Sequence, residues 1–148
     1  MITISNRVPG RAKKIDLKLL ETITAAALEE LKIETAELEI VLLGAKEMAS
    51  LNKIFLNHEG PTDVITFNYS EITESTMHGE IFVCVNEAER QAKEFGTTWR
   101  EELVRYIVHG VLHLTGHDDL TAAPRAKMKR EEERSVRKLS RRFALSRL

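Results

Sequence analysis

The 148-residue chain is 43% hydrophobic and 30% charged, a composition typical of a soluble globular protein and not of a disordered or fibrous one. Its single cysteine, Cys84, excludes an internal disulfide framework. The sequence has neither the apolar run of a signal peptide nor the roughly 20 apolar residues of a membrane span. We therefore expect one cytoplasmic domain over residues 1–148. The formal net charge is −1, but residues 124–148 hold ten Lys or Arg against three Glu, a basic end that suits either a phosphate-rich partner or a solvated helix face.

Hydrophobic periodicity predicts alternating strands and helices along the whole chain. We expect a strand at 1–6, a helix at 17–31, a strand at 36–44, a helix at 45–56, strands at 62–67 and 79–85, and helices at 86–96, 97–116 and 122–143. Asp16, Asn86 and Thr98 are placed to cap three of the helices, and Glu101 would complete a capping box with Thr98. Gly116 is expected to end the second-last helix.

This order of elements predicts an α+β fold with α/β-like features. The strand-helix-strand start favours parallel pairing, whereas the two adjacent strands later in the chain favour a hairpin. We therefore expect a single mixed four-stranded sheet covered by about five helices.

The segment VHGVLHLTGHDDL, residues 108–120, contains three of the five histidines in the chain. His109 and His113 are four residues apart, so on a helix they lie on one face, one turn apart, where two imidazoles can bind one metal ion. Gly116 can adopt a positive φ, end the helix and turn the chain back towards that ion. A third ligand would then come from His117, Asp118 or Asp119.

A lone buried histidine is usually satisfied by a hydrogen bond and binds no metal. Here, however, the polar cluster lies among aliphatic residues, where each uncompensated polar group would cost a few kcal/mol, so we favour a metal site. The position after His109, where zinc peptidases carry a glutamate as general base, is Gly110, which argues against peptide hydrolysis. We expect Gly110 to leave room for a bulky ligand near the metal.

The segment HGVLHLTGHDD resembles the signature His-Gly-x-Leu-His-Leu-x-Gly-Tyr-Asp-His of the YbeY family, bacterial metal-dependent endoribonucleases of rRNA maturation. Other stretches similar to family motifs are LNKIFLNHEGPTDVITF, GEIFVCVNEAERQA and the pair Met128 and Glu132, which fits a Met-x-x-x-Glu pattern. The resemblance extends over residues 36–133.

Two departures from the family motifs affect the expected site. Asp119 takes the position of the third histidine; a carboxylate binds zinc at a similar distance, so we prefer Asp119 as third ligand and keep His117 as the alternative. Leu56 takes the position of an arginine to which catalysis is attributed, and leucine cannot bind phosphate. His58, two residues on, is our candidate catalytic residue for orienting a phosphate, the alternative being an ordinary exposed loop histidine.

The resemblance implies a zinc-dependent, single-strand-specific endoribonuclease that matures the 3′ end of small-subunit rRNA and takes part in ribosome quality control. One Zn²⁺ per chain would be held by His109, His113 and Asp119, with RNA and the small ribosomal subunit as partners and no membrane. The basic end, including Arg125, Lys127, Lys129 and Arg130, would contact the RNA backbone, and the scarcity of aromatic residues predicts little sequence readout. Two alternatives are a metal-structured ribosome assembly factor with little nuclease activity and a metal-dependent hydrolase of another substrate.

Overall fold

A computed structural model describes residues 1–10, 14–71 and 75–148. Its elements are β1 (Ile2–Asn6), α1 (Leu17–Glu30), β2 (Ala36–Leu43), α2 (Ala45–Leu56), β3 (Val64–Asn68), β4 (Met77–Cys84), α3 (Val85–Phe95), α4 (Trp99–Leu114), α5 (Ala122–Arg142) and the short 3₁₀ turn η1 (Leu145–Arg147). The predicted α+β fold is confirmed, because the five helices accompany a single mixed four-stranded sheet.

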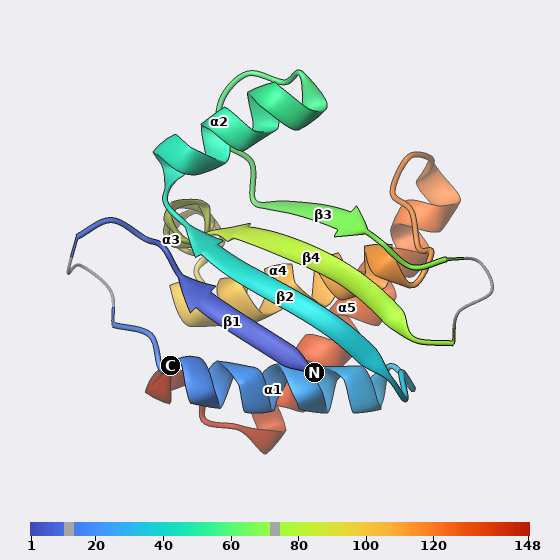
Figure 1. Cartoon of the computed structure of the whole chain (residues 1–148). Helices are drawn as coiled ribbons and strands as arrows, with labels where there is room; N and C mark the ends of the chain where they lie inside the picture. The colour runs from blue at the N-terminus through green and yellow to red at the C-terminus, as the bar shows by residue number, and fades with distance from the viewer. Residues whose placement is uncertain (11–13, 72–74) are drawn as a thin grey trace.

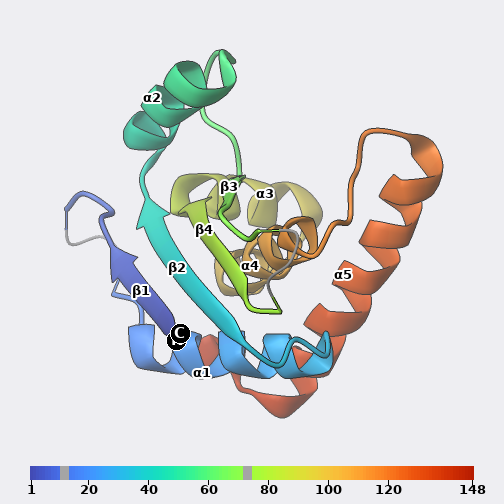
Figure 2. The same ribbon diagram turned by 45° about the vertical axis from the view of Figure 1, so that its right-hand side comes forward.

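The sheet has the strand order β1-β2-β4-β3, with parallel β1–β2 and β2–β4 pairs and an antiparallel β3–β4 pair at one edge. Helices α1 and α4 cover one face, and α5 packs outside them (Figures 1 and 2). Of the helices in the described part of the chain, α2 alone lies over the opposite face, where a small apolar cluster forms at the carboxyl ends of β2 and β4 (Figure 1). No helix in the described ranges is long and apolar enough to cross a bilayer.

Two of the three predicted helix caps are confirmed. The Asp16 carboxylate accepts a hydrogen bond from Leu19 N–H at 3.0 Å, and the Thr98 hydroxyl accepts one from Glu101 N–H at 3.1 Å. The side chain of Glu101 forms an ion pair with Arg105, whose nitrogen lies 4.0 Å from the carboxylate. Helix α1 therefore begins at the predicted residue, whereas α4 begins directly after its predicted cap, two residues later than the predicted range.

The prediction for Asn86 is wrong. Helix α3 begins one residue earlier, with Cys84 at its N-cap, so Asn86 lies inside the first turn. The Asn86 amide oxygen instead accepts a hydrogen bond from Ala45 N–H at 2.7 Å, at the start of α2. Helix α2 has Gly44 at its N-cap and thus no capping side chain of its own, so a residue 41 positions along the chain supplies the acceptor.

Gly110 faces the sheet, which corrects the expectation that it leaves room beside the metal. A Cβ at this position would lie 2.9 Å from Ile81 Cδ1 and Cγ2 and 3.2 Å from Thr66 Cγ2. Because the residue has no side chain, α4 can approach the β3–β4 hairpin closely. Gly110 thus fixes how far the histidine-bearing helix stands from the sheet.

We predict that Gly110→Val lowers the free energy of unfolding by about 1–3 kcal/mol, because the added methyl groups would overpack the contact with Ile81. Urea denaturation measures the change as a lower midpoint at an unchanged slope. Ala126→Val on the exposed side of α5 is the control and should cost at most about 0.7 kcal/mol, the intrinsic helix preference. Equal losses of unfolding free energy in both variants would contradict the idea that Gly110 allows the close contact between α4 and the sheet.

Candidate metal centre

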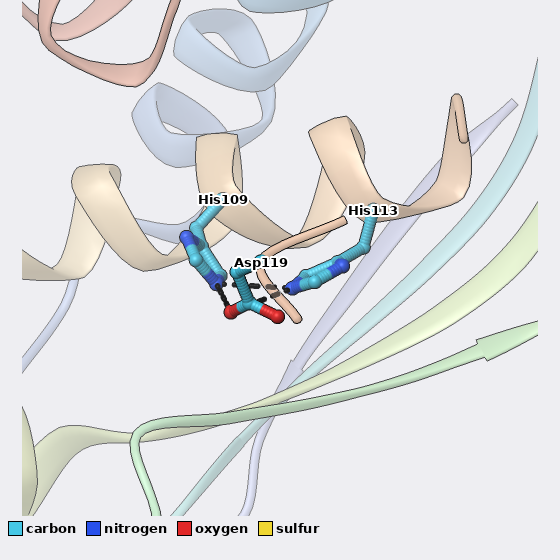
Figure 3. A group of neighbouring side chains, drawn as sticks. All are labelled: His109, His113 and Asp119. Atoms are coloured by element: carbon cyan, nitrogen blue, oxygen red, sulfur yellow. Dashed lines mark hydrogen bonds and ion pairs between the residues drawn. The ribbon is translucent and has the colours of Figure 1, made fainter. Parts of the chain in front are cut away.

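Helix α4 presents His109 and His113 to one side because its other side is buried. Val108, Val111 and Leu112 are at most 1% exposed, whereas the two histidine side chains remain about one quarter exposed. The imidazole rings stand 4.7 Å apart between centroids, and their Nε2 atoms are separated by 3.1 Å (Figure 3). The spacing expected from the sequence therefore brings two ring nitrogens together.

The chain turns back directly after α4. Gly116 has φ +99°, and the Gly116 and His117 amides donate to the carbonyls of His113 and Leu112, both at 3.1 Å. This turn carries Asp119 over the histidines, so that its Oδ2 lies 3.9 Å from His109 Nε2 and 3.7 Å from His113 Nε2 (Figure 3). Three ligand atoms from a helix and the following loop thus converge.

The spacing of these atoms fits a tetrahedral zinc ion. Zinc bonds of about 2.1 Å at tetrahedral angles place neighbouring ligand atoms about 3.4 Å apart. The observed separations of 3.1, 3.7 and 3.9 Å bracket that value. Among the described residues, His109, His113 and Asp119 are the group whose donor atoms lie within 4.8 Å of one another. The three side chains can therefore bind one divalent ion and leave a fourth position open.

The other polar residues of the loop lie elsewhere. Asp118 accepts a hydrogen bond from Leu120 N–H at 3.2 Å, and His117 lines a separate cavity beside Lys127 and Arg130. Arg125 donates from Nε to the backbone carbonyl of Asp119 at 3.1 Å and so holds the loop in place. The structure brings the side chain of Asp119 to the pair of histidines, and not those of His117 or Asp118.

Behind His109 lies a carboxylate that the sequence analysis noted only as part of a motif. Glu132 on α5 is 7% exposed, and its Oε1 lies 2.7 Å from His109 Nδ1. An ionised carboxylate only accepts hydrogen bonds, so Nδ1 is the donor and Nε2 is left to face the metal position. Arg105 lies 3.8 Å from the second oxygen of Glu132, and it also pairs with Glu102 at 3.5 Å and with Glu133.

The two histidines differ in proton affinity. Burial lowers the pKa of His109, but the hydrogen bond and charge of Glu132, together with Asp63 and Asp119, more than offset it, so the pKa lies above its ordinary value. Burial and the neighbouring His109 hold the pKa of His113 below its ordinary value. Near neutral pH, His113 therefore offers a free lone pair more readily than His109 does.

Asp63 shapes the loop before β3 and contributes a charge as well. Its Oδ1 accepts hydrogen bonds from Val64 N–H at 2.8 Å and from the Thr62 hydroxyl at 3.3 Å, which shapes the entry to β3. Its negative charge also helps to raise the pKa of His109 and partly offsets the lowering of the pKa of His113. The start of β3 therefore adds an acidic group to the edge of the centre.

Comparison of the chain with known proteins identifies its family. A sequence profile described as endoribonuclease YbeY matches residues 4–140. The chain belongs to the YbeY endoribonuclease family. Membership in this family confirms the resemblance found in the sequence and, with it, the prediction of a hydrolytic enzyme of the nuclease class.

Individual relatives resemble the chain over most of its length. Endoribonuclease YbeY of Elusimicrobium minutum is 36% identical over 136 residues, which is 90% of this chain and 94% of the relative. Endoribonuclease YbeY of Thermotoga petrophila is 37% identical over 114 residues, covering 76% of this chain and 73% of the relative. A Thermotoga maritima protein solved in solution has a TM-score of 0.65 at 29% identity, covering 94% of this chain and 89% of that one.

The position of the YbeY-family arginine is at the exposed end of α2. Leu56, which replaces it, is 45% exposed, and Asn57 follows in the left-handed conformation with φ 53°. His58 is exposed, and its backbone N–H donates to Asn52 O at 3.2 Å. His58 is thus outside the group formed by the two α4 histidines and Asp119.

We predict that Glu132→Gln weakens zinc binding roughly 10- to 100-fold, because a neutral amide orients and polarises His109 less well than a carboxylate does. Competition with a chelator of known zinc affinity measures the change. Glu131→Gln, one residue away and paired with Arg134 at the surface, is the matched control and should bind zinc like the unmodified chain. Equal zinc affinities in both variants would show that Glu132 does not contribute to metal binding.

Proposed function

We propose that this chain is a zinc-dependent endoribonuclease that cleaves single-stranded RNA in the maturation of the 3′ end of small-subunit rRNA and in ribosome quality control. The observation that carries the proposal is the convergence of His109, His113 and Asp119 within zinc-binding distance, in a member of the YbeY endoribonuclease family. The substrate and the small ribosomal subunit as partner would place the enzyme in the cytoplasm, acting as one domain over residues 1–148.

Each residue of the centre has a defined task. A divalent ion bound there through three protein ligands would supply a Lewis acid for a phosphoryl oxygen and lower the pKa of water. Glu132 keeps the His109 ring oriented, and Arg125 holds the loop that carries Asp119. Because Asp119 is anionic where the family motif has a histidine, the site would be less positive by one charge, and its bound water somewhat less acidic.

The basic end of the chain is divided between RNA contacts and internal ion pairs. His117, Lys127 and Arg130 line a cavity of about 530 Å³ between the ligand loop and the first turns of α5, which suits the phosphates of an RNA strand. Lys138 and Arg142, further along α5, pair with Glu30 and Glu29 of α1. We therefore place the RNA backbone along the N-terminal half of α5, close to the metal centre.

We predict that the unmodified chain binds one zinc ion, and that His113→Ala and Asp119→Ala lose both zinc and cleavage of single-stranded RNA because each removes a ligand. Elemental analysis of the purified proteins and a cleavage assay measure the two properties. Asp118→Ala and His117→Ala are matched controls and should retain zinc. Zinc loss in His117→Ala but not in Asp119→Ala would make the assignment of the third ligand wrong. Metal-independent RNA binding without any products would favour the assembly-factor alternative, which Leu56 supports.

For His58 we propose contact with the substrate phosphate in place of the missing arginine, since it lies exposed in the loop after α2. His58→Ala should lower kcat/KM for RNA about 10- to 100-fold, the effect of losing one charge-assisted hydrogen bond, with zinc content unchanged. Leu56→Arg is the companion variant and should retain full activity. If His58→Ala cleaves RNA at the normal rate, His58 is an ordinary loop residue.

A further inference from the structure

A second cavity adjoins the metal centre on the side of α3. It has a volume of about 370 Å³, within the range of small-molecule sites, and α3, α4, α5 and the start of β3 contribute to its wall. His109 and Glu132 form part of this wall. A group bound in the cavity would therefore lie next to a phosphate held at the metal centre.

An exposed aromatic ring borders this cavity. Phe95, at the end of α3, is 65% exposed, and Lys129 of α5 also lines the cavity. Single-stranded RNA is commonly bound by stacking its unpaired bases on such rings, and a lysine nearby attracts the phosphate backbone. The border of the cavity thus combines two features that bind a nucleotide. Its wall also holds the carboxylates of Asp63, Glu102 and Glu132, the last two paired with Arg105.

A buried hydroxyl without a partner also belongs to the wall. Tyr106 is 3% exposed, and no described residue forms a hydrogen bond with its hydroxyl. A buried hydroxyl in this state is destabilising, so an acceptor atom that reaches it would gain a favourable hydrogen bond. Because burial raises the pKa of Tyr106, the phenol stays protonated and is a donor for a carbonyl or a ring nitrogen.

Acceptors lie on the same wall. The Glu133 side chain is 40% exposed and retains acceptor capacity beside its ion pair with Arg105, and Gln91 of α3 offers both a donor and an acceptor. A carboxylate accepts a hydrogen bond from an exocyclic amino group but repels a carbonyl oxygen at the same position. At the position that Glu133 faces, the wall therefore favours amino-bearing bases over their oxo counterparts.

We propose that the cavity is a base-binding subsite, which takes the base next to the cleaved phosphate and prefers cytosine or adenine to uracil or hypoxanthine. This subsite deepens the proposed function and rests on it for the position of the phosphate. It also revises the expectation of little sequence readout, because a single base would be read beside the centre.

Nucleoside 5′-monophosphates test the preference directly, since CMP and UMP, or AMP and IMP, differ by an amino group in place of an oxo group. With zinc-loaded protein, calorimetric titration should give about tenfold tighter binding of CMP than of UMP. Phe95→Ala should weaken CMP binding about tenfold or more, and Phe95→Tyr should restore it because the ring is kept. Equal affinities for the paired nucleotides, or no effect of Phe95→Ala, would overturn the subsite.

Tyr106→Phe separates ligand binding from a structural role. Removing a hydroxyl that has no partner in the protein should leave the thermal midpoint unchanged or higher, while the affinity for CMP falls about fivefold. Tyr69→Phe, at an exposed tyrosine that hydrogen-bonds to Glu80 at 3.0 Å, is the control and should leave CMP affinity unchanged. A lower midpoint with unchanged CMP affinity would mean that the hydroxyl serves the fold and would overturn its assigned role.

The outcomes distinguish the subsite from the proposed function. If CMP binds with the expected preference but the protein cleaves no RNA, the nuclease proposal fails and the subsite stands. If RNA is cleaved equally at every base and Phe95→Ala leaves both CMP affinity and cleavage unchanged, the nuclease proposal stands and the subsite fails. Zinc content should be equal in all these variants, because none removes a residue of the metal centre.

Discussion

The position of α4 between the sheet and α5 is the constraint on which the metal centre depends. One side of the helix is fixed by apolar packing and by the absence of a side chain at Gly110, which lets it rest against Ile81. The other side is fixed by the hydrogen bond from His109 to Glu132 of α5. With both sides held, the two imidazole rings have little freedom to turn away from their common point, so the protein orders two ligands before any metal arrives.

The third ligand comes from a loop and is held by different means. Asp119 depends on the chain reversal at Gly116 and on the hydrogen bond from Arg125 to its backbone carbonyl. At 44%, its side chain is more exposed than either histidine. The candidate centre therefore combines two imidazoles held on a helix with one more exposed carboxylate carried by a loop.

The sequence was sufficient for features set by local spacing and insufficient for those set by distant partners. The four-residue interval between His109 and His113, and the helix-ending Gly116, follow from helix geometry alone. By contrast, Asn86 has a local sequence typical of a helix cap, yet its amide oxygen accepts a hydrogen bond from the start of α2. The N-cap of α2 is Gly44, which has no side chain to do so. Likewise, the contact between Glu132 and His109 spans 23 residues and depends on how α4 and α5 pack, which no local pattern encodes.

The attachment of α2 has a consequence for how this enzyme can diversify. Its start is tied to α3 through Asn86, and Met48 and Asn52 are its buried residues, whereas Ile54, Phe55 and Leu56 at its far end are exposed. Leu56 can therefore be exchanged without disturbing the packing that orients the candidate metal ligands, whereas Phe55 keeps an edge-on ring contact with Phe67 of β3. A family could replace its arginine there by leucine, while the residues that converge at the candidate centre keep their places.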